Sequence, residues 1–348
     1  MHEVAQKPIR LEESSQQLLT LPGMGAIPHP EMGCTFRVWA PHAQKLSVVG
    51  DFNHWNSEAN LCKQEENGVW ATFISEAKPG DEYKFNLWVG EKELRKNDPY
   101  ARLLTNSAGN SVIYQSKISW DADTFNPPPL HEWVIYEMHI GTFNRPAPDK
   151  IGTFESATQK LPYLQSLGIN VVELMPTAEF PGGISWGYNT AHPFAVETDY
   201  GGPDELQKFI QAAHAHGIAV VMDVVYNHFG PSDLDLWQFD GWNENNLGGI
   251  YFYNDWKATT PWGETRPDYG RPEVRQYLRD NLLMWLDDYH LDGIRMDSIC
   301  HIRNVDGNSC PPDRDIPEGW TLMQWMSEEA AKLEKNKILI AEDLKNLD

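Results

Sequence analysis

Five short apolar runs, separated by helix-like segments, constrain the fold of this chain most strongly. The runs are WVIYEMHI, NVVELMP, AVVMDVV, DGIRMD and KILIAED, and they begin at Trp133. Runs of this length that are rich in β-branched residues are typical of parallel strands buried on both faces. Their alternation with helices predicts a parallel sheet, either open and doubly wound or closed as a (β/α)8 barrel.

The intervening segments carry helix signals. In residues 202–217, Pro203 suits the first turn and Gly217 is placed to end the helix. Residues 271–289 repeat this pattern with apolar side chains at helical spacing. The apolar positions of the second helix are Val274, Tyr277, Leu278, Leu282, Trp285 and Tyr289.

The region before Trp133 follows a different pattern. TFRVWAP, KLSVVGDFNHW, GVWATFI and EYKFNLWV alternate apolar and polar residues and are separated by turn residues. This pattern predicts an all-β, immunoglobulin-like sandwich over residues 26–118. We therefore expect an N-terminal arm (1–25), the sandwich, a Pro-rich linker (119–132) and a barrel (133–348) with a loop insertion at about 229–271.

Acidic residues occur where three of the predicted parallel strands end. Asp223, Asp297 and Glu342 each follow an apolar run, so we expect all three at one rim, where barrel enzymes place their catalytic residues. A single such carboxylate is more often a helix cap or an ion-pair partner. Three at the same rim, with Arg295 and His228 beside them, indicate a site.

Two neighbouring carboxylates suit glycoside cleavage, in which one attacks the anomeric carbon and the other protonates the leaving oxygen. Mutual repulsion raises the pKa of the acid, which helps it to hold its proton. Arg295 lies two residues before Asp297, on the same face of the strand, and is expected to keep Asp297 ionised. The glycines form no G-x-G-x-x-G phosphate loop and the histidines form no cluster. No cofactor and no metal site is therefore predicted.

These motifs resemble those of the α-amylase superfamily, glycoside hydrolase family 13. DVVYNH, DGIRMDSICH and IAED look like its first three conserved regions, in the right order. The resemblance implies that Asp297 is the nucleophile, Glu342 the general acid/base and Arg295 the support of the nucleophile. It also implies that Asp223 is structural, and that the substrate contacts are Tyr188 as the stacking platform, His228, His301 and Trp186. Asn227 falls where many amylases bind calcium, and Cys300 replaces a common Lys.

The sandwich resembles carbohydrate-binding module family 48, through FRVWAP and VVGDFNHW. Its Trp55 is expected either to stack on glucan or to pack against the barrel. VIYEMHIGTF, DVVYNHFGP and TPWGE look closest to maltooligosyltrehalose trehalohydrolases, whereas GDFNHW fits glycogen branching enzymes equally well. The resemblance implies a covalent glucosyl-enzyme in both subfamilies. Water hydrolyses this intermediate in the trehalohydrolases, whereas a sugar hydroxyl accepts the glucosyl group in the branching enzymes.

The resemblance implies eight barrel strands, and KILIAED is the fifth. The third catalytic carboxylate of the family is expected on the seventh strand. We therefore expect this chain to be part of a longer enzyme of α-glucan metabolism. The alternative is a non-catalytic glucan-binding fragment.

The charge balance excludes several classes of partner. The chain has 28 Lys and Arg against 50 Asp and Glu, a net charge of −22, which repels phosphate backbones and anionic membranes. A neutral α-glucan is compatible with such a surface. The four cysteines are too sparse for a disulfide framework and no secretory signal is visible, so a cytoplasmic location is expected. The sequence carries no signal for an oligomeric state.

Overall fold

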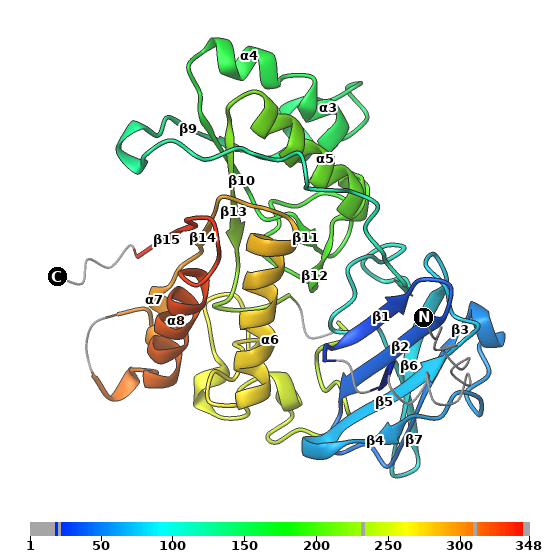
Figure 1. The fold of residues 1–348 in the computed structure, drawn as a ribbon. Helices are drawn as coiled ribbons and strands as arrows, with labels where there is room; N and C mark the ends of the chain where they lie inside the picture. Colours follow the sequence, from blue (N-terminus) through cyan, green and yellow to red (C-terminus); the bar gives the residue numbers. More distant parts are fainter. Residues whose placement is uncertain (1–17, 20–21, 231–233, 309–311, 344–348) are drawn as a thin grey trace, which may run out of the picture. The chain divides into compact units, whose positions relative to one another are not determined.

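The computed structural model describes residues 18–19, 22–230, 234–308 and 312–343 of the 348-residue chain. The chain divides into two compact units (Figure 1). The first comprises residues 1–101 and 111–115, and the second comprises residues 102–110 and 116–348. Most of the expected N-terminal arm lies outside the described residues.

The first unit contains two antiparallel sheets, with strand orders β1-β2-β5-β4 and β3-β6-β7, and β8 pairs with β6. The rings of Phe36 and Tyr83, one from each sheet, meet edge to face with centroids 5.1 Å apart. The predicted β-sandwich is thus confirmed. Its strands are β1 Gly25–His29, β2 Gly33–Trp39, β3 Lys45–Gly50, β4 Lys63–Gln64, β5 Val69–Ile74, β6 Glu82–Val89, β7 Lys92–Lys96 and β8 Ser111–Val112.

The polar positions of β2 are buried, although its sequence alternates like that of a strand with one solvated face. Arg37 donates hydrogen bonds to the carbonyl oxygens of Leu19 (2.6 Å) and Gly23 (2.8 Å), and its Nε lies 3.0 Å from the Glu65 carboxylate. The segment before β1 therefore covers this face of the sheet. Because Nε, Nη1 and Nη2 of Arg37 each donate to an oxygen, the burial of this charged side chain is tolerated.

The second unit is built on one parallel sheet with strand order β15-β14-β13-β10-β9. All five strands predicted after Trp133 are present. Within this sheet, each strand pairs with the sheet strands that come before and after it in the chain, and the order does not reverse as it does in a doubly wound sheet. This order is that of a barrel wall, as the resemblance implied. The strands are β9 Ile135–Met138, β10 Val171–Leu174, β13 Ala219–Val224, β14 Gly293–Met296 and β15 Ile338–Ala341.

The predicted helices are confirmed with one difference. Gly217 follows the first at φ +71°, a left-handed conformation that suits glycine after a helix end. The second does not stay α-helical to Tyr289, because Met284–Asp288 forms a π-helical turn. The helices are α2 Ile140–Phe143, α3 Phe154–Thr158, α4 Leu161–Ser166, α5 Gly202–Ala215, α6 Pro272–Leu283, α7 Cys300–Arg303 and α8 Pro317–Ala330, and the hairpin β11 Ala178–Glu179 with β12 His192–Val196 lies between β10 and α5.

Apolar side chains of the parallel sheet form a buried cluster. Val171, Ala219 and Val221 are fully buried in it, and Phe125, Trp133 and Ile340 pack against them. This packing holds together strands that lead to the candidate site. Among the described residues, no helix is long and apolar enough to cross a membrane.

Candidate active site

Strand register decides which of the predicted carboxylates lie at the same level. Asp297 and Glu342 directly follow the paired ends of β14 and β15, so both emerge at the carboxyl-terminal rim. Asp223 instead pairs with Arg295, two residues before Asp297. All three carboxylates lie at the end of the sheet where Arg295 contacts each of them, and Asp223 lies one layer deeper because the register of β13 against β14 sets it level with Arg295.

A single guanidinium group joins the three carboxylates. Arg295 Nη1 donates to both oxygens of Asp223, at 2.6 and 2.8 Å, and lies 3.2 Å from Asp297 Oδ1. Arg295 Nη2 lies 2.7 Å from Glu342 Oε1. Burial alone lowers the pKa of Arg295, but the hydrogen bonds and negative charges of these partners outweigh it and raise the pKa further above its ordinary value. Arg295 is therefore a permanent cation between the candidate catalytic groups.

The predicted nucleophile has a second donor. Asn227 Nδ2 donates to Asp297 Oδ2 and to the backbone oxygen of Asp297, both at 2.8 Å. Burial raises the pKa of the Asp297 carboxyl, the charge of Glu342 adds to this, and the donors from Asn227 and Arg295 act in the opposite direction. Two N–H donors aimed at its oxygens stabilise the ionised form that a nucleophile needs.

Both oxygens of the predicted acid/base also accept hydrogen bonds. Glu342 Oε1 faces Arg295, and Glu342 Oε2 accepts from the backbone N–H of Ser298 at 2.8 Å. Asp343 instead pairs with Arg303 at 2.9 Å, as expected for a residue on the opposite face of the strand. Both oxygens of Glu342 are therefore held by contacts within the site.

Tyr188 contacts the deepest carboxylate. Its hydroxyl donates to Asp223 Oδ2 at 2.7 Å. Burial raises the pKa of Asp223, whereas the donors from Arg295 and Tyr188 lower it. Burial and the charge of Asp223 together raise the pKa of the Tyr188 phenol, which stays protonated. Asp223 therefore orients Arg295 and the Tyr188 ring, as its predicted structural part in the site requires.

His228 is linked to Asp297, the predicted nucleophile, through Asn227. Its Nδ1 contacts Asn227 Oδ1 in a short hydrogen bond, and its Nε2 lies 3.3 Å from Asn189 Oδ1. Burial, followed by the positive charge of Arg266, lowers the pKa of His228 to about 4. His228 is therefore a neutral imidazole at physiological pH, and Trp262 stacks on it with ring centroids 4.6 Å apart and planes at 13°.

The other two predicted substrate contacts differ in accessibility. Trp186 is 70% exposed and lines a cavity of about 590 Å³ together with Tyr188. His301 is buried, its Nδ1 is 2.9 Å from Ser298 Oγ, and its ring meets Trp262 edge to face. The remaining residues that line the cavity are Tyr136, Glu137, His139, Thr142, Phe143 and Met175.

The structure thus joins Arg295 to Asp223, Asp297 and Glu342, and extends the network to Tyr188 and His228. Sequence reasoning missed the roles of Asn227, Asn189 and Trp262. Trp262 lies in TPWGE, a motif whose resemblance to a subfamily does not by itself indicate a place for Trp262 in the site. Among the described residues, no group of three or more His, Cys, Asp or Glu side chains could hold a metal ion.

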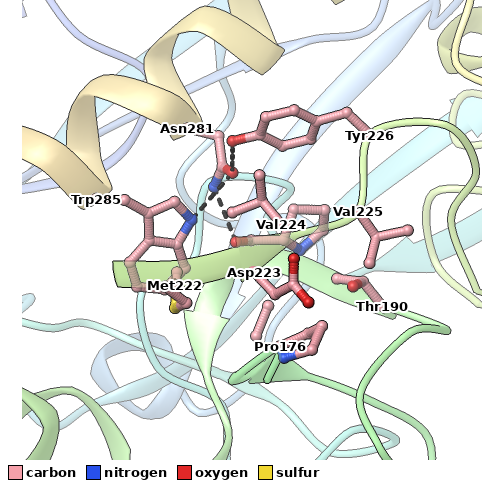
Figure 2. Close-up of a pocket in the computed structure, with 11 residues that line it drawn as sticks. Pro176, Thr190, Met222, Asp223, Val224, Val225, Tyr226, Asn281 and Trp285 are labelled. Atoms are coloured by element: carbon pink, nitrogen blue, oxygen red, sulfur yellow. Dashed lines mark hydrogen bonds between the residues drawn. The ribbon is translucent and has the colours of Figure 1, made fainter. Parts of the chain in front are cut away.

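Behind the site, the end of β13 is held by a polar cluster (Figure 2). Asn281 Oδ1 accepts from the Tyr226 hydroxyl at 2.7 Å and from Trp285 Nε1 at 3.1 Å, and Asn281 Nδ2 donates to the Pro193 oxygen at 2.8 Å. The adjoining cavity measures only about 10 Å³. Asp223 also lines this cavity, which is too small to admit a sugar.

Family models match both units of the chain. Residues 138–347 match the alpha amylase catalytic domain, and residues 23–101 match carbohydrate-binding module 48, the isoamylase N-terminal domain. The chain belongs to the α-amylase family. Because this is a family of glycoside hydrolases and transglycosylases, membership agrees with two carboxylates at a barrel rim.

Relatives within the α-amylase family include two kinds of enzyme. The 1,4-alpha-glucan branching enzyme GlgB of Oceanobacillus iheyensis is 36% identical over 283 residues, which cover 77% of this chain and 43% of the enzyme. The malto-oligosyltrehalose trehalohydrolase of Saccharolobus solfataricus is 34% identical over 272 residues, covering 77% of this chain and 44% of the enzyme. The chain therefore spans less than half the length of these curated relatives.

Solved structures agree with the fold. A Salmonella typhimurium protein provisionally named an alpha amylase has a TM-score of 0.76 and 30% identity, covering 94% of this chain and 50% of that one. A mutant pullulanase from Paenibacillus barengoltzii, complexed with maltotetraose, has a TM-score of 0.74. Its identity of 24% supports the fold alone, and it covers 92% of this chain and 53% of the pullulanase.

Proposed function

We propose that this chain supplies the nucleophile and the acid/base of a retaining enzyme that acts on α-1,4-glucans. One observation carries the proposal: the guanidinium group of Arg295 contacts the carboxylates of both Asp297 and Glu342 at the carboxyl-terminal rim of the sheet. A pair of carboxylates at one site is what glycosidic bond cleavage through an oxocarbenium-like transition state requires.

In the first step, Asp297 attacks the anomeric carbon and the glycosidic bond breaks as Glu342 gives its proton to the leaving oxygen. Glu342 must therefore exchange its contact with Arg295 for one with the glucan when substrate enters. In the second step, Glu342 takes a proton from the acceptor hydroxyl, which attacks the anomeric carbon and releases Asp297. The donors from Arg295 and Asn227 stabilise Asp297 as a leaving carboxylate.

The aromatic side chains around these carboxylates suit a sugar substrate. Tyr188, oriented by Asp223, is proposed as the platform beneath the sugar at the cleavage point, and exposed Trp186 extends this surface. Because Nδ1–H of neutral His228 donates to Asn227 Oδ1, its Nε2 can accept a hydrogen bond from a sugar hydroxyl, and Trp262 stacks on the ring at the edge of the site. The buried ring of His301 makes its proposed substrate contact dependent on movement of Trp262.

For the acceptor we propose a sugar hydroxyl, which makes the reaction glucan branching. The identity to the branching enzyme of Oceanobacillus iheyensis supports this choice. Trp262, which is 46% exposed beside the site, supports it too, because an aromatic face favours a sugar acceptor over water. Release of trehalose is the second candidate, supported by the relative from Saccharolobus solfataricus.

We also propose that the first unit binds glucan through Trp55. Its Nε1 donates to Asp51 Oδ1 at 3.1 Å, which holds the indole in place. His54 and Trp55 have φ values of 53° and 60°, an uncommon pair of left-handed residues. Strained backbone of this kind supports a functional role for the side chain it presents.

A cytoplasmic location is proposed as well, because Cys34, Cys62 and Cys300 are free and buried.

Glu342→Gln tests the proposed reaction. The variant should lose turnover of amylose while its affinity for maltoheptaose stays within about twofold, because only the proton donor changes. NMR of the products separates the acceptors: new α-1,6 linkages formed from amylose indicate branching, whereas new reducing ends from amylose, or free trehalose from maltooligosyl trehalose, indicate hydrolysis. If the unmodified chain binds maltoheptaose but turns over neither amylose nor maltooligosyl trehalose, the non-catalytic alternative holds for these 348 residues.

A further inference from the structure

The hairpin loop of residues 180–191 carries Trp186, Tyr188 and Asn189 to the site. It leaves the sheet at β11 and returns at β12, so its position depends on what closes its base. Two acidic residues lie there: Glu179 ends β11, and Glu197 follows β12. Their side chains are 2% and 1% exposed, which is unusual for glutamates.

Each carboxyl group accepts a hydrogen bond from the residue that follows the other glutamate in the chain. Glu197 Oε2 accepts from the backbone N–H of Phe180 at 3.2 Å, and Glu179 Oε2 accepts from the backbone N–H of Thr198 at 2.9 Å. Each hydrogen bond therefore ties the start of the loop to the chain after its end. Together they form a reciprocal clasp across the two strands.

The hydrogen bonds of Thr198 indicate where a proton lies. Its single hydroxyl hydrogen faces two acceptors, the backbone oxygen of Leu104 at 2.9 Å and Glu179 Oε2 at 3.0 Å. If Glu179 carries a proton, it can donate to the Thr198 hydroxyl while that hydroxyl donates to Leu104, so each contact is a separate hydrogen bond. The geometry thus accommodates a neutral carboxyl at this position.

Within the part of the chain that the structure describes, no Lys or Arg forms an ion pair with Glu179 or Glu197, and the charges that act on the two carboxyl groups come from acidic side chains. The other titratable groups that face the pair are Asp199, Tyr200, His192, which pairs with Glu179 in the hairpin, and His139, which contacts the Tyr200 hydroxyl at 2.9 Å. His139 Nε2 also contacts the backbone oxygen of Ser185 at 2.8 Å, a second tie on the same loop.

We propose that Glu179 and Glu197 are positioning residues that close the base of the 180–191 loop as a protonated pair, and that ionisation of the pair releases the loop. The part of this proposal that concerns glucan rests on the proposed function, because it makes Tyr188 and Trp186 productive only while the clasp is closed. The part that concerns the loop stands independently of any activity.

The direction of the pH effect follows from burial. Burial raises the pKa of Glu179 to about 7. Burial, followed by the charge of Glu179, raises the pKa of Glu197 to about 8. A carboxyl whose pKa is raised by folding stabilises the folded state at low pH, and this stabilisation is lost as the pH rises through the folded value. The clasp is therefore most stable at low pH, weakens as the pH rises towards 7 to 8, and changes no further above that range.

Hydrogen–deuterium exchange of peptides from residues 180–191 tests the clasp at pH 6 and pH 9, after correction for the chemical exchange rate. Between the ordinary glutamate pKa and the raised value in the closed loop, each pH unit weakens the closing equilibrium by about tenfold for each ionising group, and above the raised value it changes no further. We expect protection of the loop to fall at least about tenfold between pH 6 and pH 9. The double variant Glu179→Gln with Glu197→Gln cannot ionise but keeps an amide oxygen at each acceptor position, so its loop should stay protected at pH 9.

Glu328→Gln, an exposed carboxylate on α8, is the matched control and should behave like the unmodified chain. Glu197→Gln alone should keep about half or more of the protection that the double variant keeps at pH 9. It substitutes for the double variant if that variant folds poorly. Equal protection of the unmodified loop at pH 6 and pH 9, or an equal loss in the unmodified chain and the Gln variants, would overturn the clasp. If exchange behaves as expected but KM for glucan is independent of pH between 7 and 9, the link to substrate binding fails and the clasp stands.

Discussion

Replacing Arg295 with Met should destabilise the second unit in a manner that depends on pH. The substitution keeps an unbranched side chain of similar reach but removes the cation that contacts Asp223, Asp297 and Glu342. Three carboxylates would then lie together without a counter-charge. All four side chains are at least three-quarters buried, so solvent screening of these interactions is limited.

The magnitude follows from the contacts. One pair of charges about 4 Å apart contributes roughly 4 kcal/mol at an effective dielectric constant of about 20. Removing one partner of a buried ion pair typically costs about 3–5 kcal/mol, because it leaves a buried charge uncompensated. Proton uptake by the remaining carboxylates limits this loss. We expect a loss of about 3–5 kcal/mol in the free energy of unfolding at pH 8. As the pH falls, this loss of stability should decrease by about 1.4 kcal/mol per pH unit for each additional proton that the folded variant binds.

Urea denaturation at pH 8 and pH 5.5, followed by tryptophan fluorescence, measures both quantities. Arg295→Lys is the control, since it keeps the charge but loses the planar fork that reaches several carboxylates at once. It should lose less stability than Arg295→Met at pH 8 and show a weaker pH dependence. Equal stability of Arg295→Met and the unmodified chain at pH 8, or a loss that does not change with pH, would refute the assignment of Arg295 as the charge that joins the site.

Two further substitutions test other parts of the site. Asn227→Ala removes a donor to Asp297, so the pKa of Asp297 should rise further and the acid limb of the rate profile should move to higher pH. The lost hydrogen bond to a charged group is worth about 1.5–3 kcal/mol, and an unchanged acid limb would contradict this contact. Arg266→Met leaves four backbone oxygens of two loops without their donor, and should lower the melting temperature by roughly 6–12 °C for a loss of about 3 kcal/mol. Calorimetry measures this change in melting temperature, and a decrease of less than about 2 °C would show that water replaces the guanidinium group.

Much of the second unit could be predicted because its signals are local. Strand boundaries and helix starts depend on a few adjacent residues, so the five strands and the helices before Gly217 and Tyr289 were found where expected. The same reasoning correctly put Arg295 and Asp297 on one face of β14. The end of the second helix was missed, because a π-helical turn depends on how Trp285 and its neighbours pack.

The sandwich illustrates a different limit. Alternation along β2 predicts which residues share a face, but not whether that face meets solvent. Arg37 is buried because residues before β1 cover it and supply carbonyl oxygens, a contact between segments that no periodicity encodes.

By itself, the sequence determined the order of strands and helices and the presence of Asp297 and Glu342 at adjacent strand ends, because these follow from local propensity and spacing. Only the tertiary structure decided that Asp223 lies a layer below them and that Trp262 stacks on His228. It also decided that Glu179 and Glu197 face one another across a hairpin. Each of these results from strand register or loop packing, in which residues far apart in the chain are brought together by burial and hydrogen bonding.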